Sequence, residues 1–243
     1  PVMAAALAEN DKTRAMGELL DRWNFYDDTN QAAPTIFQAV FRKFAFHVFQ
    51  DELGPEAAGI YLDNWYIWQE RLLSMILEND SAWFDDVHTK ELRESRDDLF
   101  VRSALQVSAE LKEDPGGKPE KWLWGKVHQL ELVSPMRMNG FGKKLLGGGS
   151  HPFPGSGESL CRGWYDVDDP FWVTRSATLR MVADLADGEK VLAVMPGGVS
   201  ERIFHPHAKD QVPDFLSGEI RYWWFSDKAI SDHSKSRLVL SPL

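Results

Sequence analysis

Two histidines and a carboxylate lie close together near the end of the chain, and all three are residue types that bind metal ions. His205 and His207 flank Pro206, and Asp210 follows. Two histidines at i and i+2 on one strand point the same way and suit Zn²⁺, but Pro206 interrupts a strand and no third ligand is spaced nearby. The pattern favours a hydrogen-bonded turn in which His207, Asp210 and Gln211 satisfy buried backbone groups. A metal-dependent hydrolase using both histidines stays as an alternative.

Two single residues elsewhere offer a base and a nucleophile. His128 lies beside apolar Val127 and Leu130, so it is either a general base or a buried histidine whose ring is hydrogen-bonded, and the second is favoured. Cys161 is the only cysteine, and no histidine is spaced to pair with it in a known local motif. We expect Cys161 to be an unreactive small residue in a glycine-rich loop.

Serines also lie between glycines, as they do in some catalytic and phosphate-binding turns. The segments Gly148–Ser150 and Gly155–Gly157 lack the apolar strand and following helix that present a nucleophilic serine. The segment Gly147–Ser150 lacks the Lys-Ser/Thr pair that completes a phosphate-binding loop. Both segments are therefore predicted to be flexible loops.

Aromatic residues are more frequent than a minimal fold needs, with 10 Trp and 14 Phe in 243 residues. The runs Trp65–Trp68 and Tyr222–Phe225 would suit stacking on a sugar or an acyl chain. Packing inside the protein, or against polypeptide outside this chain, is the favoured interpretation.

Charge and composition exclude several classes of function. A formal net charge of −10 opposes binding to phosphate backbones, and the apolar runs are far short of the roughly 20 residues of a membrane span. A single cysteine rules out an internal disulfide, which fits a cytosolic protein and equally an exported bacterial one. The chain begins with Pro1 and no signal peptide follows, so we expect a processed or trimmed product, or one whose leading residues are absent.

The first part of the chain, residues 1–113, is predicted to be helical. Apolar residues recur at helical spacing over Ala32–Leu53, and Gly54–Pro55 would stop this helix. Further helices are expected over Ala57–Leu77 and Thr89–Leu111.

The remainder, residues 114–243, is predicted to be rich in β-strands. Trp122–Val133 partly alternates between apolar and polar residues, as a strand does. Thr178–Leu185 and Lys190–Met195 are expected to form a hairpin joined by an Asp-Gly turn, and a last strand is expected over Arg237–Leu240. A helical part followed by a sheet-forming part predicts an α+β fold.

Several segments, in one order and across nearly the whole chain, resemble the penicillin acylase family. They are Leu19–Asn24, Ala33–Phe37, Asp51–Leu53, Trp122–His128, Ser176–Leu185, Val194–Ser200 and His205–Gln211. The chain departs from the family pattern at Val199, Glu201 and His205, where the family usually has Gln, Gly and Ser. These departures concern local loops and the substrate class more than the fold.

The resemblance implies a four-layer αββα fold of the N-terminal-nucleophile hydrolases. Members of the family are made as one precursor that cuts itself into a small and a large subunit. The large subunit then begins with Ser, whose free α-amino group is the base for its own hydroxyl. An α-amine titrates near pH 7.7–8.0, so it can accept a proton at neutral pH, and an oxyanion hole stabilises the tetrahedral intermediate of amide cleavage.

In the family, the matched motifs belong to the last part of the large subunit. The resemblance therefore implies that the nucleophilic Ser and the oxyanion Asn lie upstream, that this chain carries no catalytic residue, and that alone it is inactive. The residues expected to form structural motifs are His128, Arg180, His207, Asp210 and Gln211.

The resemblance also sets expectations about partners. They are the small subunit and the N-terminal part of the large one, with a small amide as substrate: a penicillin, an acyl-homoserine lactone or another N-acyl amine. No cofactor is expected, and a calcium ion, if the whole enzyme holds one, would have its ligands off this chain. The location implied is periplasmic or secreted. A non-catalytic helical-plus-sheet module, binding a protein partner through exposed aromatic residues, is the other alternative.

Overall fold

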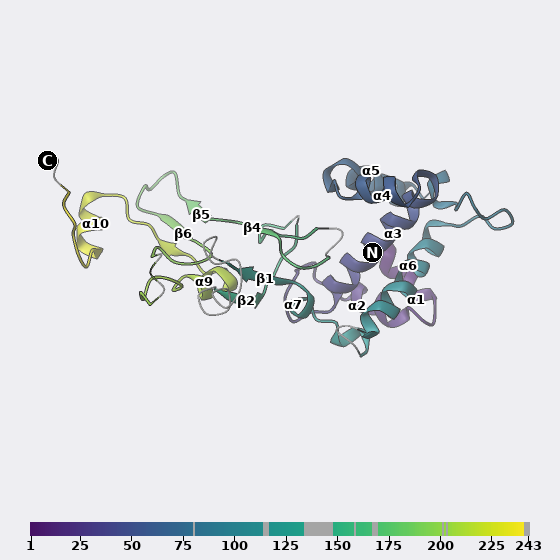
Figure 1. The fold of residues 1–243 in the computed structure, drawn as a ribbon, viewed down its shortest axis with the longest axis horizontal. Helices are drawn as coiled ribbons and strands as arrows, with labels where there is room; N and C mark the ends of the chain where they lie inside the picture. The colour runs from purple at the N-terminus through teal and green to yellow at the C-terminus, as the bar shows by residue number, and fades with distance from the viewer. Residues whose placement is uncertain are drawn as a thin grey trace. The chain divides into compact units, whose positions relative to one another are not determined.

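The computed structural model describes residues 1–79, 81–113, 117–133, 148–157, 159–166, 170–200, 202 and 204–240, with only the backbone of Trp65 and Tyr66. The chain divides into two units (Figure 1). The first contains Pro1–Leu130 and His151–Ser176, and the second contains Glu131–Ser150 and Ala177–Leu243. The boundary expected at residue 113 falls inside the first unit, and the domain division of the whole protein stays a prediction.

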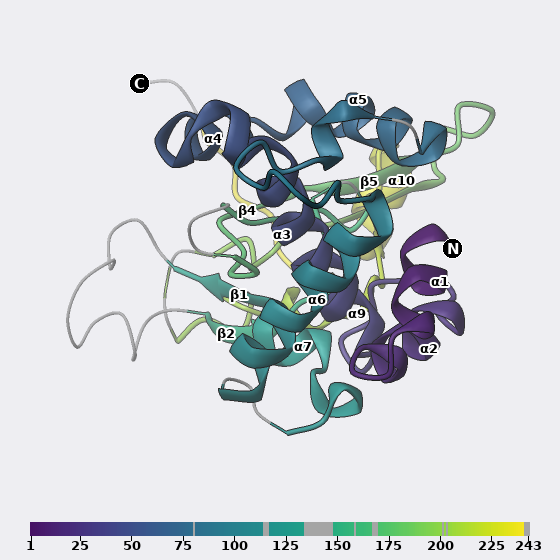
Figure 2. The ribbon, with the colours of Figure 1, turned by 90° about the vertical axis from the view of Figure 1, so that its right-hand side faces the viewer.

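Helices make up most of the first unit (Figure 2). They are α1 (Val2–Glu9), α2 (Arg14–Asp21), α3 (Ala33–Leu53), α4 (Pro55–Leu62), α5 (Trp65–Glu78), η1 (Ala82–Phe84), α6 (Arg96–Leu111), η3 (Pro119–Lys121) and α7 (Trp124–Val127).

The helix α3 is the centre of this unit, and its sequence prediction is confirmed to within one residue. Pro34 lies in its first turn, where its missing N–H costs nothing. Gly54, at φ 78°, ends the helix in a backbone conformation that favours glycine. One face of α3 is buried in the core through Ile36, Val40, Phe44 and Val48.

The helix α6 packs along α3 (Figure 2). The rings of Phe44 and Phe100 stack with centroids 4.1 Å apart. The predicted start at Thr89 was wrong: α6 begins at Arg96, because Ser95 and Asp98 form a reciprocal capping box. Before it, the Thr89 hydroxyl bonds to Glu94 and to a backbone carbonyl, which holds this segment in turns.

The single helix predicted over Ala57–Leu77 is two helices, α4 and α5, separated at Asp63 and Asn64. The Asn64 side chain donates to the carbonyl of Ile60, and the Trp68 indole donates to the carbonyl of Leu62. These side chains satisfy the last carbonyls of α4, so local capping interrupts an otherwise helical pattern.

The strand predicted over Trp122–Val133 was wrong in its first half. Residues Trp124–Val127 form the short helix α7, and only β1 (Gln129–Leu132) is extended. The backbone N–H groups of Trp124 and Gly125 donate to carbonyls just before α3, at 2.8 Å each, which turns the chain there. The pattern of apolar residues did not contain this tertiary contact.

Small antiparallel pairings follow. The strand β1 pairs with β2 (Gly149–Pro152), and these residues are divided between the two units. In the first unit, β3 (Gly163–Trp164) pairs with β4 (Arg175–Ser176). An α+β composition, helical first and sheet-forming later, is confirmed.

The second unit contains a sheet in the order β5-β6-β7, with bounds Arg180–Ala183, Val191–Val194 and Arg221–Tyr222. The predicted hairpin is confirmed as the antiparallel pair β5–β6, in which Arg180 lies opposite Val194. Two successive backbone turns connect the strands, closed by Asp187 and Lys190 N–H groups, and Gly188 lacks the positive φ of a two-residue Asp-Gly turn.

Two helices accompany this sheet, α9 (Val212–Ser217) and α10 (Asp227–His233). The last strand predicted, over Arg237–Leu240, was wrong: these residues are exposed and in no strand. A strand needs a neighbour to bond to, and no described strand pairs with them. Within the described residues, no helix is long and apolar enough to cross a membrane.

Candidate functional site

A cavity of about 830 Å³ lies in the first unit, within the size range of small-ligand sites. One wall is aromatic. Phe37 and Phe41, one turn apart on α3, have ring centroids 5.7 Å apart, and Trp23 lies 5.4 Å from both Phe37 and Phe25. Phe25 has a φ of 63°, a conformation that bulky residues rarely adopt.

The helix α5 forms an aliphatic wall of the same cavity. Leu73, Ile76 and Leu77 line it, whereas Leu72 and Met75 are buried in the core. The helix is therefore apolar on more than one side. Such a helix is typical of one that is covered on both sides.

A few polar groups lie at the remaining side. The Tyr165 hydroxyl donates to Gln38 Oε1 at 2.7 Å, and the two satisfy each other; burial raises the pKa of Tyr165. Burial also raises the pKa of Asp27, against the opposing effect of a hydrogen bond from the Ser156 side chain. Among the described residues that line the cavity there is no histidine, lysine or cysteine, and the side chain that bonds to Ser156 is the carboxylate of Asp27.

His128 is fully buried in the first unit and is neutral. Its ring stacks on Trp124 with centroids 4.3 Å apart, and its Nδ1–H donates to the carbonyl of Phe171 at 2.6 Å. Burial lowers its pKa to about 4, against the opposing effect of that hydrogen bond. Its Nε2 has no partner among the described residues and lies against Gly163, where a Cβ would overlap it. This environment supports the structural interpretation over the general base.

The histidine-rich turn in the second unit is a hydrogen-bonded network. His207 Nδ1 lies 3.1 Å from Asp210 Oδ2, and Arg221 contacts Asp210 at 2.7 Å and Asp214 at 2.5 Å. Burial raises the pKa of Asp210, but the hydrogen bonds from Arg221 and His207 outweigh burial and lower it below its usual range. The two aspartates lie four residues apart and share one guanidinium.

Gln211 and Arg180 join the same region to the sheet. The Gln211 side chain accepts from the N–H of Met195 at 3.1 Å, so it satisfies the backbone just after β6. Arg180 donates to the carbonyl of Phe215 at 2.6 Å and lies over its ring at 4.0 Å. A Cβ at Gly198 would overlap the carbonyl of His207, so the glycine allows two loops to meet.

Metal binding by this turn gains no support from the geometry. His205 Nδ1 accepts from the backbone N–H of His207, and His207 Nδ1 faces Asp210. No group of three metal-binding side chains lies together in the described part of the chain. Glu201 lies outside the described residues.

The glycine-flanked serines form no nucleophile elbow. Ser156 lies in a turn in which its N–H donates to the Ser159 hydroxyl, and that hydroxyl donates to the carbonyl of Cys161. Gly155 has a φ of 81°. The segment is a tight turn, and Gly147 of the other glycine run lies outside the described residues.

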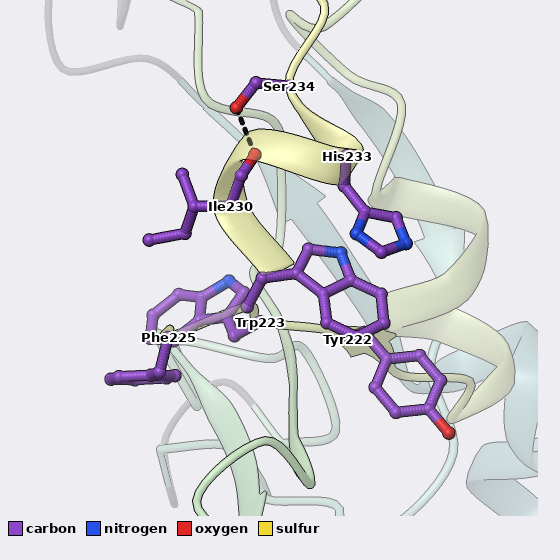
Figure 3. Close-up of a pocket in the computed structure, with 7 residues that line it drawn as sticks. Tyr222, Trp223, Phe225, Ile230, His233 and Ser234 are labelled. Atoms are coloured by element: carbon purple, nitrogen blue, oxygen red, sulfur yellow. Dashed lines mark hydrogen bonds between the residues drawn. The ribbon is translucent and has the colours of Figure 1, made fainter. Parts of the chain in front are cut away.

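The second aromatic run forms a shallow hollow of about 290 Å³ (Figure 3). Trp224 lies between Tyr222 and His233, with ring centroids at 4.8 Å and 4.0 Å. In the other run, Trp68 is buried in the core. Packing therefore accounts for Trp68, whereas Tyr222, Trp223 and Phe225 are 56%, 40% and 59% exposed.

The structure brings Arg180, His207, Asp210 and Gln211 together around the start of α9, while His128 lies in the first unit. The sequence analysis missed Arg221 and Asp214; Asp214, one helical turn after Asp210, was a usable signal. It also missed the polar cavity residues, Asp27 and Tyr165. Tyr165 lies 127 residues from its partner Gln38, and Asp27 is similarly far from Ser156, so no local pattern marks them.

Comparison with solved structures identifies a shared fold. A thermostable penicillin G acylase from Alcaligenes faecalis matches with a TM-score of 0.53 and 17% identity, over 99% of this chain and 45% of that one. The shared fold is that of the N-terminal-nucleophile hydrolases.

The family follows from the sequence. The penicillin amidase family model matches residues 1–232, and the chain belongs to this family. Acyl-homoserine lactone acylase QuiP of Pseudomonas aeruginosa is 24% identical over 98% of this chain, and QuiP of Pseudomonas fluorescens is 22% identical. The chain spans only 30% and 29% of the length of these two relatives.

Proposed function

We propose that these residues are the C-terminal part of the large subunit of a self-processing amide hydrolase. The whole enzyme would cleave a linear N-acyl amine into a carboxylic acid and an amine. The observation that carries this proposal is the family match over residues 1–232, on a chain that spans 30% of its curated relative QuiP.

The chemistry of amide cleavage indicates which catalytic groups this chain would have to provide. Amide cleavage needs a nucleophile, a base within hydrogen-bond reach, and donors for the oxyanion. In the described residues, the buried His128 is held between Trp124 and the carbonyl of Phe171. Ser156 lies in a tight turn and bonds to the Asp27 carboxylate, with no histidine or lysine in the described lining of its cavity. We infer that the reactive Ser and its α-amine lie on polypeptide outside this chain, which supplies scaffold.

Acyl-homoserine lactones are the first substrates to test, because the relatives named above are acylases of these compounds. Penicillins and other N-acyl amines belong to the same bond class. Export to the periplasm or outside the cell, and assembly with the small subunit, are part of the same proposal.

Hydrolysis assays test the proposal directly. The full-length precursor should mature into two subunits and release homoserine lactone from an N-acyl substrate. Residues 1–243 alone should release none. Turnover by residues 1–243 alone, or a full-length protein that neither matures nor cleaves any N-acyl amine, would overturn the proposal. Metal analysis of the full-length enzyme and of residues 1–243, together with calcium depletion of the full-length enzyme, tests whether any ion is bound outside this chain.

A further inference from the structure

Several apolar side chains that line the large cavity in the first unit are exposed to solvent. On α5, Leu73 is 52% exposed and Leu77 is 66% exposed, and both line the cavity. Opposite them, Phe25 is 68% exposed. Contiguous apolar surface of this kind is typical of a site that is covered by another partner.

The backbone supports a covered site as well. Phe25 adopts a φ of 63°, a conformation that costs energy in a bulky residue and persists where surrounding structure holds it. Its ring packs on one side against Trp23, at 5.4 Å. The rest of the Phe25 side chain is exposed among the described residues. Contacts that complete its packing would have to come from a group outside them.

The polar groups restrict the chemistry of the occupant. The Tyr165 hydroxyl donates to Gln38 Oε1, and the amide N–H groups of Gln38 can still donate. Asp27 is partly buried and is held by Ser156, and its carboxylate can accept further hydrogen bonds. Gln69 and Glu70 of α5 also line the cavity. An occupant that fits is therefore apolar where it meets the aromatic and aliphatic walls, and it offers a hydrogen-bond donor near Asp27.

The length of the relatives points to the source of such an occupant. The chain spans 30% of QuiP and 45% of the solved penicillin G acylase chain. Most residues of these proteins therefore lie outside the matched part. In a shared precursor, such residues could provide an apolar segment that fills the cavity.

We propose that this cavity is an internal docking site, filled in the mature protein by an apolar segment of the same precursor that lies outside residues 1–243. The segment inserts aliphatic or aromatic side chains between α5 and the wall formed by Trp23, Phe37 and Phe41, and it donates one hydrogen bond to Asp27. This inference rests on the proposed function, because it assigns a contact surface to the partner polypeptide named there.

Cysteine labelling in the full-length protein tests the proposal. Leu73→Cys places a thiol on the cavity wall, and Leu185→Cys places one in the 98% exposed hairpin connection of the second unit. A small maleimide should label Leu73→Cys at least about tenfold more slowly in the native protein than after unfolding, since a docked segment excludes the reagent. Leu185→Cys should be labelled rapidly in both states, and peptide mapping separates label on Cys161.

A photo-crosslinking residue in place of Leu77 gives a second measurement and identifies the occupant. Crosslinks to peptides outside residues 1–243 support the proposal. Rapid native labelling of Leu73→Cys that is slowed by an N-acyl amide would show that the cavity binds a ligand. Crosslinks confined to residues 1–243 would show that no outside segment occupies the cavity. Either result overturns the docking site.

These readouts are independent of enzyme activity. A full-length enzyme that is active but labels rapidly at Leu73→Cys contradicts only the docking site. A protein whose cavity is protected but which neither matures nor hydrolyses an amide contradicts only the proposed function.

Discussion

His128 illustrates how its surroundings decide what a histidine can do. In the sequence it is a candidate base, and its ring would titrate near pH 6.5 in water. In the fold it lies flat on Trp124, bonded to the carbonyl of Phe171 and enclosed by Gly163. A group in this position contributes to stability through its neutral form, because burial disfavours the charged one.

The pH dependence of stability should report this directly. Burial lowers the pKa of His128 to about 4 in the folded state, below the unfolded value of about 6.5. The stabilisation from the neutral ring is complete above the unfolded pKa and is lost as the pH falls towards 4. His128→Asn keeps a donor for the carbonyl of Phe171 and cannot titrate. Between pH 7 and pH 4.5, the wild type should lose about 2–3 kcal/mol more unfolding free energy than this variant.

Urea unfolding of the full-length protein at the two pH values measures this difference. The variant should be less stable than the wild type at pH 7, because the ring stack on Trp124 is lost. Parallel losses in both proteins on acidification would show that His128 is not the titrating group.

Gly163 offers a second test at the residue scale. A Cβ at this position would overlap His128 Nε2 and approach Phe153 at 2.9 Å, both of which are buried. Gly163→Ala should therefore destabilise the protein by about 1–3 kcal/mol, as overpacking does. Gly188→Ala is the matched control, because a Cβ there meets no atom within 4 Å, and it should change stability by less than about 0.5 kcal/mol.

Unfolding midpoints of the two glycine variants decide the matter. Equal midpoints would mean that Gly163 is not packed against His128. The sequence could not reveal this pair, because 35 positions separate the residues and the tertiary fold brings Gly163 to the ring. Asp27 and Tyr165 escaped the sequence analysis for the same reason.

At the scale of elements, the sequence predicted the apolar pattern of α3 and its glycine stop, but not the side-chain caps or the tertiary contacts. The stop at Gly54 and the long apolar stripe of α3 are properties of neighbouring residues, and both were predicted. The helix α7 depends on contacts with another segment, such as the bond from Trp124 to the carbonyl of Gln31. The break at Asn64 comes from local side-chain caps that the apolar pattern does not contain. The turn around Asp210 was predicted as a hydrogen-bonded one, but its partner Arg221 comes from a strand 11 residues further on.

The start of α6 gives a prediction at this scale. Ser95 accepts from the backbone N–H of Asp98, and the Asp98 carboxylate accepts from the backbone N–H of Ser95. Ser95→Ala removes the first bond and should cost about 1 kcal/mol of stability. Ser108→Ala makes the same chemical change inside α6 and should be neutral or slightly stabilising, because alanine is the better helix former.

Chemical unfolding of both serine variants provides the measurement. If Ser95→Ala matched Ser108→Ala in stability, the capping box would contribute nothing and the start of α6 would need another cause.

At the scale of the whole molecule, the chain has the fold of an enzyme family. Its described polar clusters form hydrogen bonds that stabilise that fold. The α6 cap, the Asp210–Arg221 network and the buried His128 stabilise the two units. The family supplies chemistry that needs an N-terminal nucleophile. We therefore propose that catalysis lies on residues outside this chain and that the residues inside it provide structural support.

The most direct measurement is the position of the covalent acyl group during turnover. The full-length enzyme is given an acyl donor that deacylates slowly, quenched in acid, digested and mapped by mass spectrometry. We predict that the acyl group will be found on a serine at the N-terminus of the large subunit, outside residues 1–243. An acyl group on Ser156, Cys161 or any other residue of this chain would contradict it.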